Sequence, residues 1–257
     1  MRFWRQAVVA IGCGIAAGPL LAGPAARAQT AAPANRVEVN IIPYMWLAGL
    51  SGSVTTHGRD LASVHQNFND VLSHLNAAVM TVATLRYNRW VAMIDFDYVN
   101  MSIKSQSSSP LLGQSSLSAT DYLGTVVGGY RVIDRPAGRL DLMAGTRIMS
   151  LNSTVSFSGG LLPGFSLGSG DTWADPLVAL RGIAPVAPHL SLFGYGDVGG
   201  GPNSDLTWQV YGGLEYSITS AITAYAGYRY LSIRHAMNAL DMTEVEQGPM
   251  LGLGYQF

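Results

Sequence analysis

The sequence predicts an all-β protein: a closed antiparallel transmembrane β-barrel of about ten strands, with eight or twelve as alternatives and a short helix in its first long connection. Three observations predict this fold. The chain starts with the pattern of an export leader, it is 48 % apolar and only 12 % charged, and it contains repeated segments in which apolar residues alternate with polar or small ones. An average soluble domain has about 25 % charged residues, so the composition favours a membrane protein.

The start of the chain has the pattern of a cleaved secretory signal peptide. A basic beginning precedes an apolar stretch over 7–21, and small residues flank Arg27 before the expected cleavage after Ala28. A lipoprotein anchored at Cys13 is the alternative, but the residues before Cys13 lack the leucine usual at that site. We therefore expect a signal peptide over 1–28, a short periplasmic segment over 29–36 and the barrel over 37–257.

The strands are predicted from period-two alternation. A segment that crosses lipid must satisfy its backbone polar groups internally, which leaves helices and closed sheets. Beyond the leader no run of about 18 apolar residues remains, and over 206–218 Trp208 and Val210 alternate with Thr207 and Gln209. The pattern predicts strands at 37–48, 75–87, 90–102, 117–132, 139–155, 171–184, 189–199, 205–218, 221–234 and 244–257.

The connections alternate in length, as expected when short turns face the periplasm and long loops face outward. In the first long connection, 49–74, apolar residues recur at helical spacing and predict a short amphipathic helix over 66–74. Such a helix either caps or partly plugs the barrel or simply lies in the loop. Aromatic residues near the strand ends are typical of interfacial girdles: Trp90, Tyr98, Tyr130, Trp208, Tyr216 and Tyr255.

The end of the chain resembles the C-terminal signal that the barrel assembly machinery recognises in bacterial outer-membrane proteins. A terminal Phe257 follows Leu251, Leu253 and Tyr255 on one face of the last predicted strand. We therefore expect three kinds of partner: outer-membrane lipid, lipopolysaccharide and, during insertion, this machinery.

Charge and cysteine content exclude several function classes. Removing the leader's three arginines leaves 12 basic and 16 acidic residues, so the mature net charge is 12 − 16 = −4 and nothing indicates nucleic-acid binding. Cys13 is the only cysteine, which excludes a thiolate metal site or disulfide in the mature chain. We expect no cofactor and no metal, and the oligomeric state is left open.

Charged residues are predicted to line the lumen, the interior of the barrel. A charge facing lipid at the midplane costs about 2–4 kcal/mol, so the alternation places charges inside. They form either a structural ion-pair network or a path for small solutes. The predicted lumen-lining set is Glu38, Arg86, Asp95, Asp97, Asp121, Arg131, Asp141, Arg147, Asp175, Arg181, Asp197, Glu215 and Arg229.

No catalytic site is predicted. Asp95 and Asp97 are two residues apart on one strand face, which could suit paired-carboxylate chemistry, but no sugar cleft accompanies them. The GxGxxG match at 194–199 has no following helix and is rejected. His235 with Asp241 in an outer loop is the best start for a hydrolase, yet no GxSxG-type nucleophile motif is present.

Several stretches resemble a group of poorly characterised proteobacterial outer-membrane barrel proteins. They are Pro43–Leu47 with Gly52–Val54, Trp173–Pro176, Gly196–Gly200, Ser204–Gln209, Gly227–Leu231 and Gly248–Phe257. The resemblance touches both ends of the predicted barrel. It implies fold and location, and it brings no activity or catalytic residue.

We therefore expect an integral protein of the Gram-negative outer membrane that is not an enzyme. Its expected role is structural or porin-like, with small-solute permeation through a charged lumen. A lipid-modifying hydrolase is one alternative. The other is an adhesin or partner-binding barrel, for which the Ser-rich connection between Ser105 and Ser118 is the best sequence support.

Overall fold

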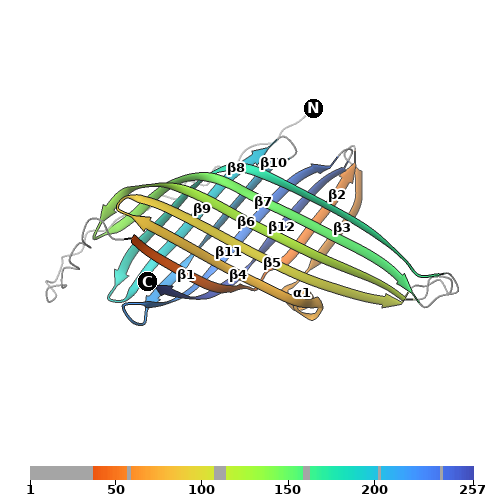
Figure 1. The fold of residues 1–257 in the computed structure, drawn as a ribbon, viewed down its shortest axis with the longest axis horizontal. Coiled ribbons are helices and arrows are strands. Elements are labelled where there is room, and N and C mark those ends of the chain that lie inside the picture. The colour runs from red at the N-terminus through yellow and green to blue at the C-terminus, as the bar shows by residue number, and fades with distance from the viewer. Residues whose placement is uncertain (1–36, 57–58, 107–113, 159–162, 202–203, 238–239) are drawn as a thin grey trace, which may run out of the picture. The chain divides into compact units, whose positions relative to one another are not determined.

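The computed structural model describes residues 37–56, 59–106, 114–158, 163–201, 204–237 and 240–257. Ten strands form one closed antiparallel barrel (Figure 1), and the antiparallel pairing of the first strand with the last closes it. This confirms the predicted fold, whereas the predicted signal peptide and the segment 29–36 lie outside the described residues. In sheet order the strands are β1 (Val37–Trp46), β4 (Leu75–Tyr87), β5 (Trp90–Gln106), β6 (Gln114–Arg135), β7 (Gly138–Ser158), β8 (Phe165–Ala187), β9 (Leu190–Gly201), β10 (Ser204–Ser217), β11 (Ile222–Met237) and β12 (Leu240–Gln256).

The strand position occupied by β1 continues in β2 (Gly49–Thr56). β1 pairs with the last part of β12, and β2 continues along β12 in unchanged register. Between the two, Leu47 lies opposite Pro249 and donates from its backbone N to the Pro249 carbonyl oxygen at 2.9 Å. Proline has no N–H to return a second bond, so the ladder is interrupted there while the strand position continues.

The register also fixes the strand tilt. We start at Asn40 in β1 and step from each residue to its ladder partner in the next strand around the barrel. The path ends at Gly52 in β2, which continues β1, so the barrel shear is 52 − 40 = 12. Ten strands with this shear tilt by about 40° from the barrel axis. The path runs through Thr84, Met93, Val127, Gly145, Leu177, Gly199, Thr207, Ile233 and Glu244.

The segment predicted as a loop with a helix contains a β-hairpin. β2 pairs with β3 (Arg59–Gln66), and the helix α1 (Phe68–His74) then leads into β4. The loop prediction was therefore wrong for 49–56 and 59–66. The hairpin lies at the end of the barrel that has the long connections, which we call the outer end because the sequence predicts that it faces outward. Beyond the membrane no lipid-facing side has to be apolar, so the small and polar residues of the hairpin show no alternation.

The predicted helix is confirmed, but it does not plug the lumen. Asn67 and Asp70 form a capping box, with both side-chain to backbone bonds at 3.1 Å. None of the residues of α1 is buried, and the helix contacts β2, β3 and β5. It therefore lies beside the barrel wall as part of the outer connection.

Several strands extend well beyond the membrane. β6, β7 and β8 have 22, 21 and 23 residues, whereas a tilted strand needs about 9–11 residues to cross a bilayer. The sequence predicted shorter strands because hydrophobic alternation stops where the outward face meets water. These outer extensions give the barrel a large non-membrane part.

The alternation of inward and outward side chains follows the prediction in the membrane-spanning part. In β5, Met93 and Asp95 are 1 % and 2 % exposed, whereas Trp90 and Ile94 are 64 % and 50 % exposed. The outward apolar surface also includes Leu251, Leu253, Tyr255 and Phe257. Their recognition by the assembly machinery stays a prediction. Among the described residues no helix is long and apolar enough to cross a membrane.

Glycine allows a close approach of strands β10 and β11. A Cβ added to Gly213 would collide with the carbonyl oxygen of Ala226. We expect Gly213→Ala to lower the free energy of unfolding by about 1–3 kcal/mol, because neither backbone can move away within the ladder. Gly194→Ala in neighbouring β9 is the control, since its Cβ would meet nothing within 4 Å. Denaturant unfolding in detergent micelles measures both, and equal stabilities would contradict the prediction.

Candidate functional site

The lumen contains the charged residues that the alternation assigned to it. Five of the thirteen are partly exposed, namely Glu38, Arg86, Asp121, Arg181 and Glu215. The other eight are buried: Asp95, Asp97, Arg131, Asp141, Arg147, Asp175, Asp197 and Arg229. They gather in three zones along the barrel, which differ in how completely their charges are paired.

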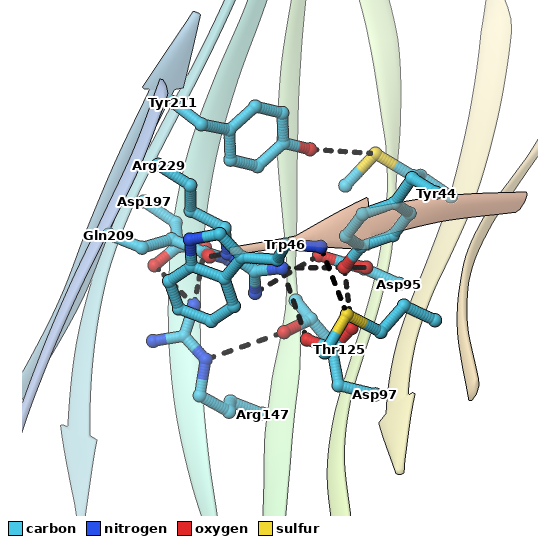
Figure 2. A network of polar contacts seen from close by, with 12 residues as sticks. Tyr44, Trp46, Asp95, Asp97, Thr125, Arg147, Asp197, Gln209, Tyr211 and Arg229 are labelled. Carbon is cyan, nitrogen blue, oxygen red and sulfur yellow. Dashed lines mark hydrogen bonds and ion pairs between the residues drawn. The ribbon is translucent and has the colours of Figure 1, made fainter. Parts of the chain in front are cut away.

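The central zone is built around Arg229 of β11 (Figure 2). Its guanidinium pairs with Asp97 at 3.1 Å and with Asp95 at 3.3 Å, both on β5. The Tyr44 hydroxyl of β1 accepts from Arg229 at 2.6 Å and lies 2.5 Å from Asp97 and 2.8 Å from Asp95. The Trp46 ring lies 4.4 Å from the guanidinium carbon, a cation–π distance. These contacts join β1, β5 and β11 across the lumen.

A second arginine continues the network on the other side. Arg147 of β7 makes two bonds of 2.7 Å to the carboxylate of Asp197 on β9 and one of 2.6 Å to the Thr207 hydroxyl on β10. Gln209 links the two arginines, because its amide donates to Asp197 at 2.7 Å and its carbonyl accepts from Arg229 at 3.0 Å. Figure 2 shows Arg147, Asp197, Gln209 and Arg229 meeting inside the barrel.

The central zone leaves its charged groups almost without contact with solvent. Arg147 and Arg229 are 0 % and 1 % exposed, and Gln209 is 1 % exposed. Buried charges are tolerated when paired and hydrogen-bonded, and these two arginines are held by several acceptors each. Apolar side chains pack around the network inside the barrel: Val91, Met93, Val127, Met143, Met149, Leu177, Leu231 and Ile233. The barrel is therefore filled at its middle.

A second zone, which we call the periplasmic zone because the sequence predicts that its short turns face the periplasm, contains a smaller ion-pair group. Asp141 of β7 is shared by Arg131 and Arg181, each at 2.8 Å. Arg86 of β4 pairs with Glu38 of β1, and both side chains are about one-fifth exposed. In these two groups each acid is paired with a nearby arginine.

The outer zone is different because four of its acids form no ion pair with a described residue. Asp121 of β6 and Asp175 of β8 lie on its inner wall together with Glu244 and Glu246 of β12. None of these four carboxylates forms an ion pair with a described residue. The sequence prediction missed both glutamates, since the last strand was judged from its C-terminal half, although their even spacing with Met250 places them on the inner face.

His235 lies in the same zone with a partner that the sequence did not indicate. Its Nε2 is 2.9 Å from Asp171 Oδ2, and its ring stacks on Trp173 at 3.8 Å. Asp241, the partner considered from sequence, instead pairs in the ladder with Ala236. Ala236 and Asp241 lie on the face opposite to that of His235. The His–Asp pair therefore comes from β11 and β8, which are distant in sequence.

Two chemical possibilities raised by the sequence find no support in the geometry. Asp95 and Asp97 are both held by Arg229 and Tyr44 and are 2 % and 4 % exposed, so they are not available as a catalytic carboxylate pair. The GxGxxG stretch lies within strand β9. In the described part of the chain, no group of three or more histidine, cysteine or acidic residues could hold a metal ion.

Comparison with known proteins supports the fold. No family model and no curated protein sequence matches this chain. Among solved structures, the chain is similar to the outer membrane protease OmpT from Escherichia coli, with a TM-score of 0.59 and 14 % identity over 89 % of this chain and 99 % of that chain. It also matches the translocator domain of the autotransporter NalP from Neisseria meningitidis, with a TM-score of 0.44 and 15 % identity over 88 % of this chain and 90 % of that one. The likeness to the protease barrel, together with the closed antiparallel sheet, shows that the chain has the fold of outer-membrane β-barrels.

Proposed function

We propose that this chain is a sealed barrel of the bacterial outer membrane whose functional surface is its outer part, where it binds a ligand or partner. The sequence left several roles open, including partner binding and small-solute permeation. The proposal chooses partner binding over permeation. The observation that carries it is the burial of Arg147 and Arg229, at 0 % and 1 % exposure, in a network that joins opposite walls.

A permeation path needs a continuous hydrated lumen. Arg147 and Arg229 are the two longest side chains of the central zone, and both are engaged with acceptors on neighbouring and opposite strands. Opening a path would break several buried charge-assisted bonds at once, which is costly. The outer extensions of β6, β7 and β8 provide the remaining surface on which such a protein could act.

Solute flux into liposomes tests this proposal. We expect liposomes that contain the purified protein to swell in small sugars or amino acids no faster than liposomes without protein. A general porin reconstituted at the same density serves as the positive control. Swelling that depends on solute size in the manner of a pore would contradict the sealed lumen.

The proposed role is not catalytic. A hydrolase is the second candidate, favoured by the His235–Asp171 contact of 2.9 Å and by the likeness to a barrel described as a protease. Activation of a side-chain nucleophile by a base needs a hydrogen bond between them, and the buried Nδ1 of His235 has no partner among the described residues. Cleavage of fluorogenic peptides or phospholipids that is lost in His235→Ala would support the hydrolase instead.

The proposed partners follow from the location. Lipid and lipopolysaccharide would contact the outward apolar surface, and the assembly machinery would recognise the C-terminal strand during insertion. Deletion of Phe257 should therefore lower the amount of folded protein in outer-membrane fractions, whereas the same deletion should have little effect on refolding of the purified chain in detergent.

A further inference from the structure

Acidic side chains from opposite walls converge in the outer zone of the lumen. Glu246 and Glu244 lie two and four residues beyond Gly248, which pairs with Arg229 of the central network. Asp121 lies four residues beyond Thr125, the inward residue of β6 beside Arg147. β6 and β12 are separated by several strands on either path around the barrel, so these carboxylates approach each other across the lumen.

The converging carboxylates interact with one another. Glu244 interacts electrostatically with Asp121, and Glu246 interacts with both of them. Glu246 also interacts with Arg229, but that guanidinium already serves Asp95 and Asp97. Like charges that face each other in a confined space repel one another, and a cation that enters between them relieves this repulsion. The outer zone thus has acidic groups for a cationic ligand, and Asp121, Glu244 and Glu246 form no ion pair with a described residue.

A second observation points in the same direction. Asp175 is 1 % exposed and lies on the inner face of β8, between Trp173 and Leu177, yet its Oδ2 has no hydrogen-bond partner among the described residues. An unpaired buried carboxylate oxygen is costly unless a donor reaches it. The donor that it lacks is what an ammonium or guanidinium group would supply.

The spacing of the acids favours an extended cation over a single metal ion. Glu244 and Glu246 are two residues apart on one strand, a separation of about 6.6 Å, and Asp121 and Asp175 lie on other strands. No compact set of three metal ligands exists in the described part of the barrel. Carboxylates distributed in this way match amino groups distributed along a flexible chain.

We propose that the outer zone of the lumen binds a linear polycation through its alkylammonium groups, with Asp121, Glu244 and Glu246 as the carboxylates that hold them and Asp175 at its floor. The source of these groups is either a free polyamine or the lysine side chains of a basic peptide. This inference rests on the proposed function, because it assigns the ligand chemistry of the outer binding surface.

Calorimetric titration of the full protein in a non-ionic detergent tests the inference. Spermine represents free polyamines and tetralysine represents basic peptides, each at about 20 mM salt so that screening is weak. We expect one of the two to bind, and we expect Glu244→Gln/Glu246→Gln to raise its Kd at least about tenfold. Asp121→Asn, from the opposite wall, should also raise the Kd. This variant keeps the test possible if the double variant does not fold.

The matched control is Asp241→Asn. Asp241 carries the same charge on the same strand, but it is exposed and lies on the other face. The Kd of the Asp241→Asn protein for the probe that binds should therefore stay within about twofold of the native value. Equal effects of Asp241→Asn and Glu244→Gln/Glu246→Gln would overturn the site, as would absence of binding by both probes. Binding of Mg²⁺ alone with this dependence on the glutamates would overturn the polycation in favour of a metal ion. These outcomes leave the sealed lumen untouched, whereas pore-like liposome swelling overturns the proposed function itself.

Discussion

Replacing Arg229 with alanine should lower the free energy of unfolding by about 3–5 kcal/mol, the usual cost of removing one partner of a buried ion pair. Asp95 and Asp97 would remain buried at 2 % and 4 % exposure with their shared cation gone. Trp46 would lose the guanidinium above its ring as well. Urea unfolding in detergent micelles, followed by tryptophan fluorescence, measures the change.

Arg135→Ala is the control for loss of an arginine as such. Arg135 is exposed at the periplasmic end of β6 and forms no ion pair with a described residue, so its replacement should change stability by no more than about 0.5 kcal/mol. Arg229→Lys should give an intermediate loss, because an ammonium keeps the charge but its three donors cannot serve the four acceptors Asp95, Asp97, Tyr44 and Gln209 that the guanidinium contacts. Equal stability of the Arg229→Ala and Arg135→Ala proteins would show that the central network is not a structural element.

The pair of Arg147 and Asp197 should show strong coupling in a double-mutant cycle. Both side chains are 0 % exposed and are joined by two bonds of 2.7 Å. Either Arg147→Met or Asp197→Leu alone leaves an unpaired buried charge and should cost about 3–5 kcal/mol, whereas the double variant removes both charges and should cost less than either single change. The coupling energy is therefore expected to reach about 2 kcal/mol or more.

The pair of Arg86 and Glu38 provides the reference cycle. These side chains are 21 % and 22 % exposed, so water screens the pair and the coupling should stay below about 1 kcal/mol. Additive costs at Arg147 and Asp197, with no difference from the reference pair, would contradict the assignment of the central zone as a desolvated network.

The membrane-spanning part of the fold could be predicted because lipid imposes a rule on each strand. An outward residue must be apolar, so strands such as β4 and β9 are visible as alternation, and 75–87 coincides with β4. The inward position of Asp95, Asp97 and Arg229 follows from the same rule. Beyond the membrane the rule no longer applies, and the hairpin of β2 and β3 and the ends of β6, β7 and β8 were missed for that reason.

The arrangement of the site could be predicted only in part. Periodicity assigns a residue to a face, but partners across the lumen depend on shear, which no single strand reveals. The pairing of Arg229 with β5 and of His235 with Asp171 follows from that shear. Tyr44, Gln209 and Thr207 were assigned no role from sequence, because neutral residues become important only where a buried guanidinium needs their oxygens.

The sealed lumen is tested most directly by ion current through single proteins in a planar lipid bilayer. We expect the native protein to add no steady conductance steps at either polarity. Folding of the same preparation is checked by the shift of its band on heating in SDS gel electrophoresis. Stepwise openings of the native protein, with an ion selectivity that changes in Asp95→Asn, would contradict this expectation and restore the lumen as a pathway for ions.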